Sequence, residues 1–351
     1  MNSNPENSSR HANTDWLRAL AIVLVLMHHL GQNLNTLPSI ALNYFKLGAH
    51  GVDLFFVLSG WLICGLYWQE QSRFGSVQIG RFWARRWLRT LPAYFAVLPI
   101  AYLSVYLFRQ QEFDWVYLVF GQNYREKIPF FLVSWSLAVE EHFYLILPIL
   151  LGLLGWLRVP MLYAVGGLII IFANIRLLDA NVSSGATFGY SVTASHFHFT
   201  GLFLGVFLAK LKCSYSVFWV RLLSYGNFFA IVSLGTFFTL PLWSAEAQYY
   251  WGNNVAIFAA ASLLLLAQHR AQLWCASTKL VKRVALTSYS VYLTHAMVIN
   301  AVLLLCEGFA LDFFSMIPLT IVVIFLVGEA LYLFVEKPSM QFRERLVKRR
   351  H

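Results

Sequence analysis

Residues 313–335 read FFSMIPLTIVVIFLVGEALYLFV, an apolar run in which Glu329 is the one charged side chain. A helix needs roughly 20 predominantly apolar residues to cross a bilayer, so this run is long enough to span it. Transmembrane strands instead alternate apolar and polar residues over roughly 10 positions, which does not match a continuous run. The stretch therefore predicts a membrane protein built from helices.

Comparable apolar runs recur along all 351 residues, of which 59% are hydrophobic and 12% charged. This composition excludes an ordinary soluble protein, where charged residues make up about 25%. We predict an all-α, polytopic helical bundle that forms a single membrane domain over residues 1–351, with about ten transmembrane helices. The expected spans are Trp16–Leu34, Val52–Trp68, Leu91–Phe108, Phe130–Leu154, Pro160–Leu177, Phe197–Leu211, Asn227–Trp243, Asn254–Gln268, Val284–Cys306 and Phe313–Val335.

The basic residues indicate the orientation. The net charge is +10, but the Lys and Arg side chains form short clusters between apolar segments, which argues against nucleic-acid binding. With cytoplasmic termini, all but five of the 26 basic residues fall on the cytoplasmic side, as the positive-inside rule requires. We expect a polar N-terminal tail at 1–14, without a cleaved signal peptide, and a basic cytoplasmic tail at 336–351. The five exceptions are Lys46, Arg109, Arg125, Lys127 and Arg176.

The first span carries Arg18 and His29, eleven residues apart. At about 100° per residue the two side chains fall on nearly the same helix face, with Arg18 near the cytoplasmic end and His29 deeper. An anionic substrate entering from the cytoplasm would meet Arg18 while its reactive end reached His29, a candidate general base. The alternative is that Arg18 extends to the interface and His29 bonds a neighbouring helix.

The fourth span contains Glu140, Glu141 and His142 in succession. Adjacent carboxylates on a helix point in different directions, so we expect one to face the bundle interior and the other an interface. Glu140 as the residue that orients His29 is a hypothesis, by analogy with the carboxylate and histidine pairs of catalytic triads. The alternative is an ion pair that fixes helix packing, with an arginine of the basic loop as partner.

A basic cluster follows the second span, with Arg81, Arg85 and Arg89 on one helical stripe and Arg86 beside it. Such a cluster attracts phosphates, and Trp83 and Trp87 offer rings on which a flat group can stack. Lipid head groups are an equally good explanation for any single arginine here.

Smaller signals complete the candidate set. Asp53 opens the second span, and Ser59 and Gly60 are small enough to allow close helix approach. Tyr292 and His295 lie one turn apart in the ninth span. His196 and His198 are a weak metal signal without further ligands at suitable spacing, so we predict no metal site.

Together these segments resemble the acyltransferase-3 family of integral membrane O-acyltransferases over nearly the whole chain. In this order and spacing the motifs are highly specific. They are Asp15-Trp16-Leu17-Arg18 with His29, the run Gly51–Gly60, Arg85-Arg86 with Arg89 and Pro92, Trp135-Ser136-Leu137 with Glu140-Glu141 and Phe143-Tyr144, Tyr289 with Tyr292-Leu293 and His295, and Glu336-Lys337-Pro338.

The resemblance implies transfer of an acyl group, usually acetyl from cytoplasmic acetyl-CoA, to a hydroxyl of a cell-surface glycan such as O-antigen or exopolysaccharide, or of a lipid-linked sugar. The implied location is the bacterial inner membrane, among membrane lipids. The expected site residues are His29, Glu140 and Arg18 for catalysis, Arg85, Arg86, Arg89 and Trp83 for CoA, and Asp53, Ser136, Tyr292 and His295 for substrate.

Other function classes stay open. Buried Arg, His and Glu also form proton relays, so a proton-coupled transporter or flippase of a polar solute is the main alternative, although no repeat symmetry supports it. A non-catalytic membrane scaffold is a second alternative. The sequence leaves undetermined the acceptor, the choice of acetyl or succinyl donor, direct transfer or an acyl-enzyme, and the oligomeric state.

Overall fold

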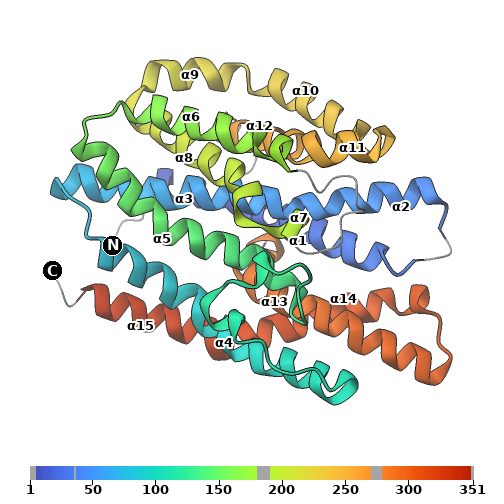
Figure 1. The fold of residues 1–351 in the computed structure, drawn as a ribbon. Helices are drawn as coiled ribbons and strands as arrows, with labels where there is room; N and C mark the ends of the chain where they lie inside the picture. Colours follow the sequence, from blue (N-terminus) through green and yellow to red (C-terminus); the bar gives the residue numbers. More distant parts are fainter. Residues whose placement is uncertain (1–4, 35–36, 180–189, 270–278, 349–351) are drawn as a thin grey trace.

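The computed structural model describes residues 5–34, 37–179, 190–269 and 279–348, and within these ranges the chain is helical, with no strand (Figure 1). The predicted all-α helical bundle is confirmed. The helices are α1 (Pro5–Gly31), α2 (Ser39–Lys46), α3 (Gly51–Phe74), α4 (Ile79–Arg109), α5 (Trp135–Trp156), α6 (Met161–Asn174), α7 (Tyr190–Thr193), α8 (Phe199–Ser214), α9 (Ser216–Ser224), α10 (Gly226–Thr239), α11 (Ala245–Ala247), α12 (Asn253–His269), α13 (Lys279–Phe309), α14 (Phe313–Leu331) and α15 (Lys337–Lys348).

Each of the ten predicted spans overlaps one of these helices. In the described residues, 7 helical stretches are long and apolar enough to cross a membrane, and the bent pair α8 and α9 makes up to 8. The other two predicted spans correspond to α1, which carries Asp15, Arg18, His28 and His29, and to α10, which is a shorter apolar helix. A total of about ten spans therefore stays a prediction, as does the side on which the termini lie.

Both expected tails contain helix. α1 begins at Pro5, so residues 5–14 continue directly into the first apolar segment. Residues 337–348 form α15, which packs against α4, and the Ser339 hydroxyl donates to the Leu88 carbonyl at 2.6 Å. Residues 1–4 and 349–351 lie outside the described residues.

Helix α3 occupies the middle of the bundle and packs most extensively against α8 (Figure 1). The two backbones approach very closely, because glycines lie at the crossing. A Cβ atom on Gly60 would lie 2.0 Å from the Leu202 carbonyl oxygen, and one on Gly205 would lie 2.2 Å from that of Val57. The close approach expected at Gly60 is confirmed, and it fixes the depth and rotation of α3.

We expect Gly205→Ala to destabilise the protein, because its methyl group would overlap a backbone atom that has no side-chain freedom. Overpacking of this kind costs about 1–3 kcal/mol. Thermal unfolding in detergent, followed by size-exclusion chromatography, measures the effect. Gly235→Ala in α10 is the matched control, because nothing lies within 4 Å of a Cβ there. Equal unfolding midpoints for the two variants would contradict the prediction.

Candidate active site

A cavity of about 450 Å³ lies between α1, α3, α4 and α15. Its apolar wall comes mainly from α3, including Leu58 and Leu62, and from Phe82 of α4. Its polar wall is strongly basic, because five arginines and two glutamates line it. These charged residues are Arg18, Arg85, Arg86, Arg89, Arg343, Glu70 and Glu344.

The arginines differ in how far their charge is compensated. Arg85 forms an ion pair with the buried Glu70 at 2.9 Å, and Arg343 lies 4.0 Å from the largely exposed Glu344. Within the described ranges, Arg18 and Arg89 have neither an ion pair nor a side-chain hydrogen bond. Guanidinium groups that face a partly apolar cavity without a direct carboxylate partner make it a candidate binding site for an anionic ligand with an apolar part.

A smaller cavity of about 70 Å³ continues inward from the first. The two share Arg18, Phe55, Ser59, Arg86 and Arg89 in their linings, so these side chains mark the junction between them. Beyond the junction the smaller cavity is lined by hydroxyl and carboxylate groups. These belong to Thr90, Ser136, Glu140, Ser288, Tyr289 and Tyr292.

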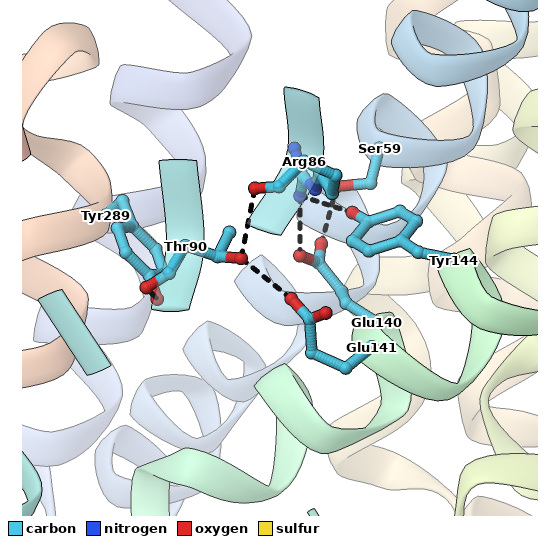
Figure 2. A network of polar contacts seen from close by, with 7 residues as sticks. All are labelled: Ser59, Arg86, Thr90, Glu140, Glu141, Tyr144 and Tyr289. Atoms are coloured by element: carbon cyan, nitrogen blue, oxygen red, sulfur yellow. Dashed lines mark hydrogen bonds and ion pairs between the residues drawn. The ribbon is translucent and has the colours of Figure 1, made fainter. Parts of the chain in front are cut away.

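Figure 2 shows the polar network at this junction. Arg86 donates to Glu140 at 2.9 Å and to the Tyr144 hydroxyl, and its guanidinium carbon lies 4.1 Å from the centre of the Tyr144 ring. The Ser59 hydroxyl donates to the other Glu140 oxygen at 2.5 Å. Both oxygens of Glu140 are thus engaged, and the carboxylate is held between α3, α4 and α5 (Figure 2).

The hypothesis that Glu140 orients His29 is therefore wrong in its geometry, and the alternative ion pair with an arginine of the basic cluster is what the structure contains. The physical reason is the helix order. α1 packs mainly against α13 and α3, whereas α5 contacts α4 and α3. Periodicity places Glu140 on an inward face but does not say which helix that face meets.

The neighbouring Glu141 is also turned inward, which corrects the expectation that one of the two carboxylates faces an interface. It is buried, and one of its oxygens accepts a hydrogen bond from the Thr90 hydroxyl at 2.8 Å. The Thr90 carbonyl in turn accepts from the Tyr289 hydroxyl at 2.8 Å (Figure 2). Arg86 and Thr90 lie one turn apart on α4, so both adjacent carboxylates of α5 find a partner on it.

His29 lies against α13. Its ring centre is 4.8 Å from that of His295, which is fully buried. The Nδ1 atom of His295 lies 2.7 Å from the Tyr292 carbonyl, which only accepts, so Nδ1 carries the proton. In the neutral ring Nε2 is then an acceptor, and in the described structure it has no partner. The structure thus gives His29 two ring neighbours, His295 of α13 and His28 of its own helix, whose ring centre lies at 4.9 Å.

Tyr292 connects the histidine pair to the smaller cavity. Its hydroxyl lies 2.6 Å from the Ser136 hydroxyl and donates to the Val133 carbonyl at 3.1 Å. Its ring centre is 5.6 Å from that of His295. Ser136 and Tyr292, both expected to bind substrate, are therefore brought together at the inner end of the path from the arginines.

His29 and His295 line neither cavity, and two further expected site residues, Trp83 and Asp53, lie apart from both the cavities and the histidine pair. Trp83 stacks on Trp87 at 5.6 Å between ring centres and donates its indole N–H to the Tyr144 carbonyl, so its ring is already packed. Asp53 is buried and hydrogen-bonded to His50 at 2.7 Å. Neither residue lines the two cavities.

Sequence reasoning missed Arg343, which was assigned to a basic tail. The signal for its position is its spacing from Ser339. Arg343 follows Ser339 by four residues, so the two side chains lie on the same face of α15. As Ser339 bonds α4, that face points toward the basic cluster.

The described residues contain no group of three or more His, Cys, Asp or Glu side chains that could hold a metal ion. His198 lies just before α8 and contacts the Val192 carbonyl at 2.7 Å.

The chain belongs to the acyltransferase-3 family, because the family's acyltransferase domain model matches residues 11–330. A Staphylococcus aureus (strain COL) protein that is provisionally named an O-acetyltransferase is 27% identical over 370 aligned positions, which cover 95% of this chain and 57% of the relative. The peptidoglycan O-acetyltransferase OatA of Listeria monocytogenes is 32% identical over 167 positions, covering 42% of this chain and 25% of the relative. This chain thus spans just over half the length of the Staphylococcus relative. No solved structure matches it.

Proposed function

We propose that this chain is an O-acetyltransferase of the bacterial inner membrane that moves an acetyl group from cytoplasmic acetyl-CoA to a hydroxyl of an envelope glycan. One observation carries the proposal. An arginine-lined cavity narrows past Arg18 and Arg89 into a smaller one that ends at Ser136 and Tyr292, beside the pair His29 and His295. In this proposal residues 1–351 act as one membrane domain with cytoplasmic termini.

The donor binds through its phosphates and delivers its thioester inward. The larger cavity offers the arginines without a direct carboxylate partner for the pyrophosphate and an apolar wall for the rest of the nucleotide end. The pyrophosphate lies at the junction against Arg18 and Arg89, and the narrow pantetheine arm extends inward from there. The acetyl group then reaches the hydroxyl groups of Ser136 and Tyr292.

The acceptor is a glycan or lipid-linked sugar. Support comes from the curated relatives, among which the Listeria OatA protein is named for peptidoglycan O-acetylation. His29 belongs to the last turn of α1, eleven residues beyond Arg18, which lies in the middle of the helix. An acceptor that approaches from the extracytoplasmic side therefore meets His29 while the donor arrives from the side of Arg18.

In the mechanism, a ring nitrogen of His29 takes the proton from the acceptor hydroxyl, and the oxygen attacks the thioester carbonyl. The tetrahedral intermediate collapses, the C–S bond breaks, and the CoA thiolate leaves. The proton stays on His29. The Nε2 acceptor of His295 steadies the imidazolium formed in this step. Glu140 has a different role from the one expected, since it positions Arg86 at the junction.

The test uses purified protein in lipid vesicles with radiolabelled acetyl-CoA and an envelope glycan extract. Label that moves to glycan only in the presence of active protein supports the proposal. A protein that neither binds nor consumes acetyl-CoA, but couples a solute gradient to proton movement, would make the transporter alternative correct.

We expect His295→Ala to lower kcat by about 10–100-fold while KM for acetyl-CoA changes little, because His295 acts through His29 and lies outside the donor cavities. The pH profile of kcat should also shift, because the protonation of His29 depends on its neighbour. Loss of a purely structural contact would leave this profile unchanged. His269→Ala, at the end of α12, is the control. A His295→Ala enzyme with wild-type kcat and pH profile would contradict the assignment.

A further inference from the structure

The larger cavity has one basic residue from outside the segment that the family model matches. That model ends at residue 330, and Arg343 lies in α15, which begins at Lys337. Arg343 nevertheless lines the cavity together with Arg85 and Arg89 of α4. Its side chain is 25% exposed, so it is neither buried in an internal pair nor free in solvent.

Three contacts fix α15 at this place. The helix packs along α4, the Ser339 hydroxyl bonds the Leu88 carbonyl, and the preceding Glu336 is buried and accepts a hydrogen bond from Ser290 at 2.8 Å. Leu88 is adjacent in sequence to Arg89, and Arg343 lies one turn beyond Ser339. The Arg343 side chain is therefore placed at the larger cavity by the packing of α15 on α4 and by the two hydrogen bonds that precede it in the chain.

The residues that line the two cavities give the order of the arginines from the smaller cavity outward. Arg18 and Arg89 line both cavities and so lie at the junction, whereas Arg85 and Arg343 line only the larger one. Arg85 is paired with Glu70 at 2.9 Å. Glu344 lies 4.0 Å from Arg343 but is 64% exposed, so solvent weakens its compensation of that charge. Arg343 is thus the least compensated cation outside the junction.

Acyl-CoA has its negative groups in a fixed order. The pyrophosphate follows the pantetheine arm, and the ribose 3′-phosphate lies beyond it, next to the adenine. This monoester carries about −1.5 to −2 charges near neutral pH and three acceptor oxygens. With the thioester in the smaller cavity, the pyrophosphate reaches Arg18 and Arg89, and the next phosphate lies farther out, where Arg343 is.

We propose that Arg343 of the C-terminal helix binds the ribose 3′-phosphate of the donor and makes the protein select CoA thioesters over their 3′-dephospho forms. The proposal rests on the proposed function for the identity of the donor. It adds a binding residue and a donor specificity that the proposed function does not name.

The test is equilibrium binding to purified protein in phosphatidylcholine nanodiscs, with labelled acetyl-CoA competed by CoA or by 3′-dephospho-CoA. We expect the wild type to bind CoA roughly tenfold more tightly than 3′-dephospho-CoA, the difference that one charge-assisted contact provides. Arg343→Gln should remove this preference by weakening CoA alone. Arg345→Gln, on an exposed position of the same helix, is the matched control and should keep it.

Two outcomes would overturn the inference while the proposed function stands. One is wild-type protein that binds both competitors equally, and the other is an Arg343→Gln protein that weakens both by the same factor. If Arg343 instead holds the phosphate of an anionic lipid, its substitution reduces retention of labelled phosphatidylglycerol and leaves the CoA preference unchanged, which also overturns the inference. Wild-type protein that binds neither competitor would show that the donor assignment itself fails.

Discussion

His29→Ala should reduce acetyl transfer by about 10²–10⁴-fold in kcat, the usual contribution of a positioned general base. The His29 ring lies in the last turn of α1 and contacts the ring of His295, whose Nε2 has no hydrogen-bond partner in the described structure. Removal of the imidazole leaves the acceptor hydroxyl without a base, while the phosphate-binding arginines are untouched. Binding of acetyl-CoA should therefore persist when transfer is lost.

The adjacent histidine supplies the control for this prediction. His28 is hydrogen-bonded to Gln32 at 2.9 Å, and its ring meets that of His29 edge-on at 4.9 Å between centres without contacting His295. His28→Ala removes the same chemical group one position earlier and should keep most of the activity. An inserted, folded His29→Ala protein that transfers acetyl groups at a rate near that of His28→Ala would refute the role given to His29.

Glu140→Ala should destabilise the protein by about 3–5 kcal/mol, because it leaves the Arg86 guanidinium buried without its counter-charge. The ion pair is 2.9 Å long, and both side chains are largely shielded from solvent, at 17% and 14% exposure. Thermal unfolding in detergent measures the loss. The double variant Arg86→Met with Glu140→Leu should be more stable than Glu140→Ala alone, because no unpaired charge remains.

A more exposed pair in the same protein provides the comparison. Arg283 and Glu329 join α13 and α14, and the arginine side chain is 47% exposed. Glu329→Ala should cost about 1 kcal/mol or less, since solvent screens the remaining charge. If Glu140→Ala and Glu329→Ala unfold at the same temperature, the Arg86 network does not contribute the stability assigned to it.

Much of the fold follows from the sequence, because the bilayer leaves few options for long apolar runs. Every predicted span overlaps a helix, and the small residues at Gly60 mark a real helix crossing. What periodicity cannot supply is the identity of the neighbouring helix. It correctly turned Glu140 inward but paired it with His29, whereas the packing of α5 on α4 gives it Arg86.

In the candidate site, too, the sequence identifies inward polar residues but not their neighbours. Arg18, Ser136 and Tyr292 line one path, and all three are among the site residues that the family resemblance implied. Trp83 was expected to stack on a ligand because indole rings do so, but a neighbouring tryptophan one turn away satisfies the same preference. Arg343 was overlooked because a basic C-terminal segment is the usual topological signal, and only the packing of α15 on α4 shows that it reaches the cavity.

The crossing of α3 and α8 limits which substitutions the bundle is able to accept. Gly60 is the neighbour of Ser59, whose hydroxyl bonds Glu140, so the closest backbone contact and the Arg86 network are one residue apart. A substitution at Gly205 touches no group of the two cavities, yet any shift of α3 that accommodates it moves Ser59. Sequence drift on α8 is therefore constrained by a polar network that is built from other helices.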